Sequence, residues 1–412
     1  MRLHINRAAI RFALPVLVVG GLVVVSFVLP SHTRFSLGGL PVGYGYGYGS
    51  QPQPFVASLN PTDGQPTGGQ SVAISGSNFN AGATAKFGSV PAPLVVNSSS
   101  SATATSPPQI SEGIVNVSVS NTGGGTWVKT NAYAYLKGVY EMDAFGGMHV
   151  ASSAGAPVTN GPLFPAKLGR SAVHLSTGVN GFVLDAWGGL HPFTTGSNTM
   201  PTQPANFPYW PNFDIARDVV LVSGTTAANA SGYVLDGWGG IHPFGTAPSV
   251  TNFAYFPNHD VAKRMFLFSD GNGGYVLDAW GGIHPFATGA NALPAPITNF
   301  GYWPNFNIAR DFALLPSSTG ASASGFTLDG WGGLHLFNSA TATPPVTPGD
   351  FPYFPNFDIA RAVRLAPATT GSNPQGWILD GYGGEHEFGD APPLAPFPYY
   401  PGNDVARQLA LQ

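Results

Sequence analysis

The sequence predicts an all-β protein built from many short strands, and three observations lead to this fold class. Short runs of alternating or β-branched residues recur between turns rich in glycine and proline, which number 55 and 39 among 412 residues. The hydrophobic fraction of 43% is too high for a chain that stays disordered. A motif with an aspartate, an aromatic residue, two glycines and a histidine recurs six times after residue 137.

The first residues predict export from the cell. Arg2, Arg7 and Arg11 precede an uncharged apolar run, FALPVLVVGGLVVVSFVL, at 12–29. Positive residues before such a run keep that end on the cytoplasmic side, so we expect the remainder outside the cell or on its surface. An apolar helix within 1–37 is expected to act as a signal peptide or as a membrane anchor, and the sequence leaves both open. It is the only membrane contact we expect.

Residues 38–136 predict a linker and a first domain. The stretch GGLPVGYGYGYGSQPQP at 38–54 has no apolar face and is interpreted as a flexible linker. Within 55–136, NPTDGQPTGGQSVAISGSNFNAGATAKFG is followed by TATSPP and GIVNVSVSNTGG. This order of motifs resembles the IPT/TIG domain family. The resemblance implies an immunoglobulin-like sandwich that serves as a spacer or interaction module, and it transfers no catalytic residue.

Residues 137–412 form a repeat array of six units, which begin 42 to 51 residues apart at Gly138, Gly181, Gly232, Gly274, Gly325 and Gly376. A unit contains a strand such as GYVL, a turn Asp-x-Trp-Gly-Gly, a strand such as IHPF, a proline-rich stretch and a segment such as YWPNFDIARDVVLV. Such periods are typical of propeller blades. The pattern resembles repeats of exported bacterial proteins and, more loosely, the WD-repeat and kelch families. We therefore predict a six-bladed β-propeller.

Loop lengths predict how the strands combine. The IAR strand that ends one unit is joined to the next hairpin by a short loop, which indicates that the two pair. A fourth strand is expected from the PYWPNF segment. This phasing leaves a hairpin at 138–150 and a strand at 405–411 without partners. Because exposed strand edges favour aggregation, we expect these two to pair and to close the ring.

The repeated aspartates and histidines are interpreted as structural. Each histidine follows its aspartate by six residues, across the hairpin turn, where the two side chains can hydrogen-bond. WD-repeat blades are held by a comparable network. The pairs are Asp185 with His191, Asp236 with His242, Asp278 with His284, Asp329 with His335 and Asp380 with His386, and Asp143 with His149 in the degenerate first unit.

The aromatic residues of the same turns are candidates for ligand binding. They either pack against the next blade or form a ring that stacks on the flat faces of a glycan or another polymer. These residues are Trp187, Trp238, Trp280, Trp331 and Tyr382, with Phe145 in the first unit.

A second motif predicts contacts between blades. An arginine that stacks on an aromatic ring and pairs with a carboxylate would latch two blades together. The pairs are Asp214 with Arg217, Asp358 with Arg361 and Asp404 with Arg407, while Asp260 with Lys263 and Asn307 with Arg310 keep the spacing with changed chemistry. In the last unit, Glu385, Glu387 and Asp390 lie beside His386, and a solvated edge is favoured there over a cation site.

No recognised catalytic, metal or cofactor motif occurs, and a unit offers two metal ligands where a site needs three or more. We therefore predict no catalytic residue, metal or cofactor. The charged fraction of 9% and net charge of −4 argue against a nucleic-acid partner. The favoured function is an exported binding or adhesion protein for carbohydrate or another extracellular polymer. The alternatives are an extracellular enzyme with a site in the central channel and a purely structural envelope component.

Overall fold

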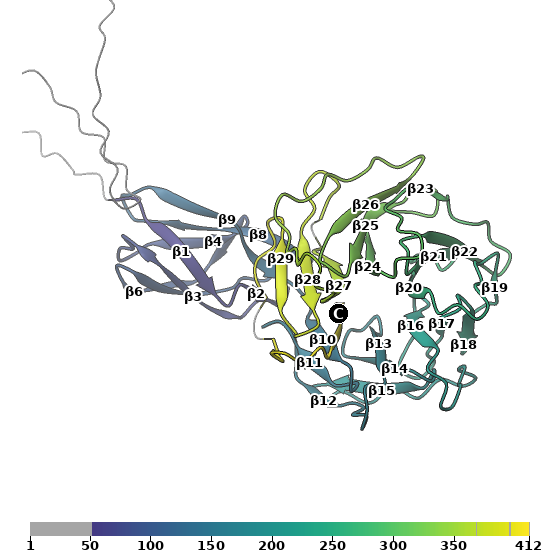
Figure 1. Cartoon of the computed structure of the whole chain (residues 1–412). Coiled ribbons are helices and arrows are strands. Elements are labelled where there is room, and N and C mark those ends of the chain that lie inside the picture. The colour runs from purple at the N-terminus through teal and green to yellow at the C-terminus, as the bar shows by residue number, and fades with distance from the viewer. Residues whose placement is uncertain (1–51, 368, 395–396, 412) are drawn as a thin grey trace, which may run out of the picture. The chain divides into compact units, whose positions relative to one another are not determined.

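The computed structural model describes residues 52–367, 369–394 and 397–411, which contain thirty strands in eight sheets and no helix (Figure 1). The prediction of an all-β protein is confirmed for these residues. The expected apolar helix at 12–29 and the linker up to residue 51 lie outside the described residues.

The first two sheets form a sandwich. One has the strand order β1-β3-β7-β6 and the other β2-β9-β8-β4-β5. Alternate residues point inward, so that Val72 and Ile74 of one sheet pack with Phe87, Val117 and Tyr133 of the other. The strands are β1 (Phe55–Asn60), β2 (Asp63–Gly64), β3 (Ser71–Ser77), β4 (Thr84–Phe87), β5 (Val90–Ala92), β6 (Leu94–Ser98), β7 (Ser101–Thr105), β8 (Gly113–Ser120) and β9 (Thr126–Tyr135).

Six further sheets each combine an inner strand with a hairpin, and in five of them the inner strand directly precedes the hairpin in the sequence. The inner strands are β13 (Gly169–His174), β16 (Ala216–Leu221), β20 (Ala262–Leu267), β24 (Ala309–Leu314), β27 (Ala360–Leu365) and β30 (Ala406–Leu411). The middle strands are β10 (Val139–Asp143), β14 (Asn180–Asp185), β17 (Gly232–Asp236), β21 (Gly273–Asp278), β25 (Ser324–Asp329) and β28 (Gly376–Asp380). The hairpins end with β11 (Met148–Val150), β15 (Leu190–Thr195), β18 (Ile241–Phe244), β22 (Ile283–Thr288), β26 (Leu334–Ser339) and β29 (Glu385–Phe388).

The predicted phasing is confirmed, because each of the inner strands β13, β16, β20, β24 and β27 pairs with the hairpin that follows it, as β16 does with β17. The predicted source of the fourth strand is wrong. Three sheets have a short fourth strand, and it lies in the proline-rich stretch: β12 (Val158–Asn160), β19 (Val250–Thr251) and β23 (Ile297–Asn299). The PYWPNF backbone is engaged elsewhere, since the amide of Trp210 donates to the carbonyl of Trp187 in a hairpin turn.

The six sheets close into a ring (Figure 1). Each inner strand contacts the next, from β13 through β16, β20, β24 and β27 to β30, and β30 contacts β13. At the junction β30 pairs antiparallel with β10, with Val139 opposite Leu411, and the amide of Ala144 donates to the carbonyl of Val405 at 2.7 Å. The predicted pairing of the last strand with the first hairpin is thereby confirmed.

Candidate functional site

The hairpin turns have the same hydrogen-bond network in all six sheets. In the second unit, Asp185 Oδ1 accepts from the amides of Trp187 and Gly189, both at 2.8 Å. Its other oxygen lies 2.8 Å from His191 Nε2. The equivalent aspartate and histidine atoms are also 2.8 Å apart in the other five units. Each aspartate therefore has both oxygens engaged within its own turn.

Glycine is required at the end of this turn. A Cβ at Gly189 would lie 2.5 Å from Asp185 Oδ2 and 2.8 Å from His191 Nε2. The preceding Gly188 has φ of +92°, a conformation that side chains disfavour. The paired glycines of the motif thus allow the aspartate and histidine to approach each other.

Replacing His242 by alanine is expected to lower the free energy of unfolding by about 1–3 kcal/mol, because a buried oxygen of Asp236 loses its partner. Denaturant unfolding of the variant measures this loss. The matched control is His259→Ala, since His259 is exposed and lies outside the turn network. Unchanged stability together with a loss of ligand binding would contradict a structural role for the pair.

The turn aromatic residues are half-buried. This applies to Trp187, Trp238, Trp280, Trp331, Tyr382 and Phe145. Three of them contact a phenylalanine of the preceding PNF segment, with ring centroids 5.9 Å apart for Trp238 and Phe213 and for Trp331 and Phe306. These three rings are thus supported by packing, and all six residues are neither fully buried nor fully exposed.

The two aromatic residues of each YW or YF pair have different environments. The second ring packs on the histidine of the following unit, as Trp210 does on His242 with centroids 4.9 Å apart. The same contact in the last unit joins Tyr400 to His149, across the closure of the ring. The predicted stacking of arginine on these rings is not observed among the described residues, because the histidines occupy that position.

The first ring of each pair is exposed, and sequence reasoning missed this. Five equivalent tyrosines are 49–57% exposed: Tyr209, Tyr255, Tyr302, Tyr353 and Tyr399. They lie beside the hairpin turns, because the next residue is bonded to the turn backbone. A tyrosine precedes the second aromatic residue in five units, and this repetition could have singled out the position. In extended backbone, neighbouring side chains point in opposite directions, so the tyrosine is directed away from the packed second ring.

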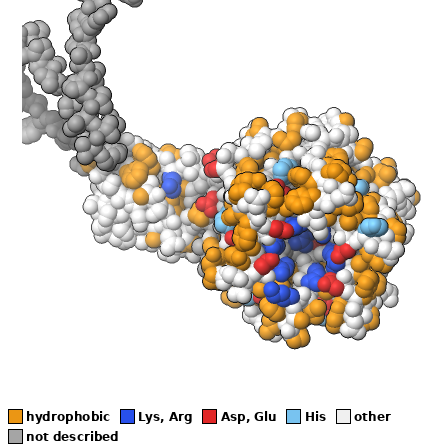
Figure 2. Space-filling view, in the orientation of Figure 1, with side chains coloured by type: hydrophobic (Ala, Val, Ile, Leu, Met, Phe, Trp, Pro, Cys, Tyr) orange, Lys and Arg blue, Asp and Glu red, His pale blue; other side chains and the backbone are white. Residues whose placement is uncertain are grey.

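We call the end of the ring that carries the six hairpin turns the turn face. The inner strands begin at this end, since the carbonyl of Ile215, just before β16, accepts from the amide of Gly237 in a turn. The second residue of each inner strand is cationic, and Lys and Arg side chains gather in the hollow at the centre of the ring (Figure 2). These residues, the cationic ring, are Arg170, Arg217, Lys263, Arg310, Arg361 and Arg407.

Aspartates between these cations latch neighbouring units together. Arg217 bonds Asp214 of its own segment at 2.9 Å and, through Nε, Asp260 of the next segment at 2.9 Å. Arg361 joins Asp358 and Asp404 in the same way. The predicted carboxylate latch between units is confirmed at these positions.

The arginines lower the pKa of the latch aspartates. Partial burial acts to raise the pKa of Asp214, but hydrogen bonds and charge from Arg170 and Arg217 outweigh it and hold the pKa below its ordinary value. The same balance lowers the pKa of Asp358 and Asp404. These aspartates therefore stay ionised, and each is shared by two cations.

Below the cationic ring, the central channel contains a buried polar network. Asp218 accepts from the Ser171 hydroxyl at 2.5 Å and from the Met265 amide at 2.7 Å. Arg264 lies 3.7 Å from both Asp218 and Asp311. Its guanidinium also donates to the carbonyls of Arg170 at 3.5 Å and Arg407 at 3.1 Å. One side chain from β20 thus contacts β13, β16, β24 and β30, which places it on the axis of the ring.

These channel residues differ between units, as an enzyme with a site in the channel would require. However, their polar groups hydrogen-bond or pair with one another. Asp311 pairs with Arg364 at 2.7 Å and with the Val363 amide at 3.0 Å. Gln408 accepts from the Ala172 amide at 2.6 Å. Burial raises the pKa of Asp218, against the effect of Arg264. The network therefore joins the inner strands and leaves these named groups engaged with one another.

The acidic residues of the last unit are not all solvated. Glu387 and Asp390 are exposed, but both carboxylate oxygens of Glu385 are buried and have no hydrogen-bond partner among the described residues. The prediction of a solvated edge is therefore wrong for Glu385. Glu385 lies close to Glu141 of the first unit, where the ring closes. Glu141 is also fully buried and has no hydrogen-bond partner among the described residues.

Two pockets of about 400 and 450 Å³ lie at the opposite ends of the inner strands, away from the cationic ring. The first is lined by small and apolar residues such as Ser317, Thr343 and Pro344. The described residues include no cluster of three or more Asp, Glu, His or Cys side chains that could hold a metal ion. Among the same residues, no helix is long and apolar enough to cross a membrane.

Comparisons with known proteins identify one region. Residues 54–135 match the IPT/TIG domain family, which confirms the resemblance stated for this part of the chain. No curated protein matches the chain.

Solved structures show only distant similarity. A protein of unknown function from Bacteroides thetaiotaomicron is 11% identical, with a TM-score of 0.37, over 87% of this chain and 92% of that one. An auxiliary nutrient binding protein from the same organism is 11% identical, with a TM-score of 0.32, over 82% and 97%. One from Bacteroides ovatus is 12% identical, with a TM-score of 0.28, over 87% and 90%. At these values the similarities do not extend to function.

Proposed function

We propose that the chain is an exported cell-surface or secreted protein that binds carbohydrate or another extracellular polymer through a six-bladed β-propeller. The organisation is a signal peptide or anchor at 1–37, a linker at 38–54, an IPT/TIG spacer at 55–136 and a propeller head at 137–412. The family match at 54–135 supports the spacer. The closed cycle of inner strands and the pairing of β10 with β30 support the propeller.

The repeated exposed tyrosines carry the binding proposal. Five of them occupy equivalent positions beside the hairpin turns, and each is about half exposed. A tyrosine presents a flat apolar face and a hydroxyl at low entropic cost, which suits it to stack on sugar rings. Several equivalent copies on one rigid ring bind a repeating polymer with higher avidity than one copy does. The turn residues Trp187, Trp238, Trp280, Trp331 and Tyr382 complete this surface in our proposal.

A glycan array probed with the full chain tests the proposal. We expect retention of at least one class of polysaccharide, with stronger binding to long chains than to their short oligomers. An array on which neither polysaccharides nor their oligomers are retained would contradict it and would favour a purely structural role. The enzyme alternative is not favoured, because the polar side chains of the channel are bonded to one another.

Replacing Tyr209, Tyr255, Tyr302 and Tyr353 by alanine, one after another, is expected to weaken polymer binding stepwise, to at least tenfold for all four. The unfolding midpoint should stay unchanged, because the side chains are half exposed. Affinity measurements and thermal unfolding check the two parts separately. Trp238→Ala serves as the contrast and is expected to lower stability as well, since its ring contacts Phe213. If the unfolding midpoint falls with each tyrosine substitution while the affinity is unchanged, these rings are packing residues.

A further inference from the structure

The turn face concentrates positive charge that the sequence distributes over six units. The cationic ring has six slots between neighbouring cations, and a residue of each segment preceding an inner strand fills one slot. Four slots hold an aspartate. The other two hold Asn307 and Lys167, at the position that Asp214 has in its segment. Seven cations thus face four carboxylates, an excess of three positive charges in a chain whose net charge is −4.

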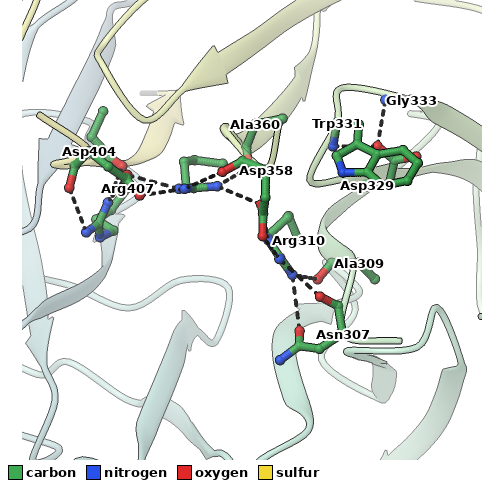
Figure 3. A network of polar contacts seen from close by, with 12 residues as sticks. Asn307, Ala309, Arg310, Asp329, Trp331, Gly333, Asp358, Ala360, Asp404 and Arg407 are labelled. Carbon is green, nitrogen blue, oxygen red and sulfur yellow. Dashed lines mark hydrogen bonds and ion pairs between the residues drawn. The ribbon is translucent and has the colours of Figure 1, made fainter. Parts of the chain in front are cut away.

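The slot at Asn307 lacks a carboxylate between two cations. Arg310 flanks this slot on one side, where it donates to Asn307 Oδ1 at 3.1 Å; it also pairs with Asp358 of the next slot (Figure 3). Lys263 flanks the slot at Asn307 on its other side, and its ammonium forms no hydrogen bond or ion pair with a described residue. Burial lowers its pKa, and although Asp260 opposes this, the charges of Arg310 and Arg217 add to the decrease. An anion placed in this slot would stabilise the charged form of Lys263.

The slot at Lys167 holds a cation between two others. The Lys167 ammonium donates to the carbonyl of Asp404 at 3.1 Å, and Arg170 donates to the carbonyl of Lys167 at 3.0 Å. Arg407 pairs with Asp404 alone, whereas Arg217 and Arg361 each have two aspartates. Burial lowers the pKa of Arg407, with the charges of Arg361 and Arg170 adding to it against the effect of Asp404.

The two slots lie on opposite sides of the ring. In the cyclic order of the inner strands, Asn307 precedes β24 and Lys167 precedes β13, three positions apart in a ring of six. The exposed Tyr302 lies a few residues before Asn307 in the same segment, whereas the segment that contains Lys167 has no such tyrosine and exposes Leu163. A ligand that reaches both slots therefore also meets Tyr302.

We propose that the turn face binds an acidic polysaccharide, whose carboxylate groups occupy the slots at Asn307 and Lys167. This rests on the proposed function and specifies its ligand. A carboxylate is the group that the protein itself places in the other four slots, and in three of them both neighbouring arginines bond to it. Sugar rings suit the neighbouring tyrosines. A duplex nucleic acid fits less well, because its evenly spaced phosphates meet a cationic area confined to one ring.

The test compares polygalacturonate, dextran of matched length and a DNA oligonucleotide as probes of the full chain. We expect polygalacturonate to bind most tightly and to bind less tightly as salt rises. The double variant Lys167→Asp, Asn307→Asp completes the alternation of charges and should weaken polygalacturonate binding at least tenfold. Its unfolding midpoint should be unchanged or higher, because four slots already hold aspartate. The charge-matched control is the double variant Lys86→Asp, Asn97→Asp, at exposed positions of strands β4 and β6, which also lowers the net charge by three and should have no effect on binding.

The outcomes separate this inference from the proposed function. If dextran binds as tightly as polygalacturonate, or if the double variant retains full affinity, the acidic ligand is wrong and the polymer-binding function stands. If DNA binds as tightly as polygalacturonate, the cationic ring does not distinguish polyanions and the polysaccharide assignment is wrong. If the chain binds neither polygalacturonate nor any polysaccharide of the array, both proposals are wrong.

Discussion

Deleting residues 404–412 is expected to unfold all six sheets of the ring together. The deletion removes β30, which pairs with β10 and contacts the inner strands β13 and β27. It also removes Leu409, which is fully buried, and the Gln408 oxygen that accepts from Ala172. Because the ring has no free end in the intact chain, the loss exposes two edges at once. We expect loss of the cooperative thermal transition of residues 137–403, measured by calorimetry.

Limited proteolysis distinguishes global unfolding from local fraying. A linear array with coupling between nearest neighbours would lose only the hairpin at 139–150 and keep its unfolding midpoint. That result would show that the propeller assignment is wrong. A synthetic peptide of residues 404–412 provides the control, since its addition should restore protection if the missing strand alone is responsible.

The stability of the ring is expected to fall as the pH rises from about 5 to about 8, because two carboxyl groups are buried at its closure. In other units, an aliphatic residue just before the histidine packs against a branched residue of the next middle strand, as Leu190 does against Val234. At the closure these positions hold Glu385 and Glu141. A Cβ on Gly383 would lie 3.2 Å from Glu141 Oε2, so the carboxyl of Glu141 contacts the neighbouring turn.

The direction of the pH effect follows from the pKa values. Burial, with the nearby charges of Asp143 and Asp380, raises the pKa of Glu141 from 4.5 to about 8. Burial, with the charges of Glu141 and Asp63, raises the pKa of Glu385 well above its ordinary value. The folded chain therefore holds protons that the unfolded chain releases, and stability is lost as pH rises above 4.5 toward 8. For Glu141 alone, the raised pKa corresponds to a loss of roughly 5 kcal/mol in the free energy of unfolding by pH 8, since one pKa unit equals about 1.4 kcal/mol.

Substitution at the two positions tests this account. The double variant Glu141→Val, Glu385→Leu installs the residue types of the other units and should abolish most of the decrease between pH 5 and pH 8. At pH 8 it should be more stable than the parent chain by several kcal/mol, measured by denaturant unfolding. The control Glu387→Gln changes an exposed carboxyl two residues away and should leave the pH profile unaltered. A parent chain whose stability is constant or rises over this range would contradict the burial of two protonated carboxyls.

The repeat was sufficient to predict the hairpins, their inner strands and the closure, because each follows from one spacing that recurs six times. The fourth strands were misplaced, because the bonding of the Trp210 amide to a turn carbonyl depends on tertiary structure and has no local signature. The repeated tyrosines, such as Tyr209, can be recognised in the sequence. Their exposure cannot, because only the packing of the folded chain distinguishes Tyr209 from the adjacent Trp210. The role of Glu141 could not be predicted from the turn motif of the first unit, because Glu385 belongs to the last unit and the two residues approach each other only when the ring closes.

The position of Arg264 determines how a ligand can enter the ring. Its guanidinium contacts inner strands on several sides of the axis, and the side chain is 10% exposed. The passage through the six sheets is therefore blocked by a side chain that is itself fixed by hydrogen bonds and ion pairs. A polymer chain therefore cannot pass through the centre of the ring from one end to the other. If the chain binds a polymer as proposed, the polymer lies across the turn face, and only its side groups or its chain end reach toward Arg264 from that side.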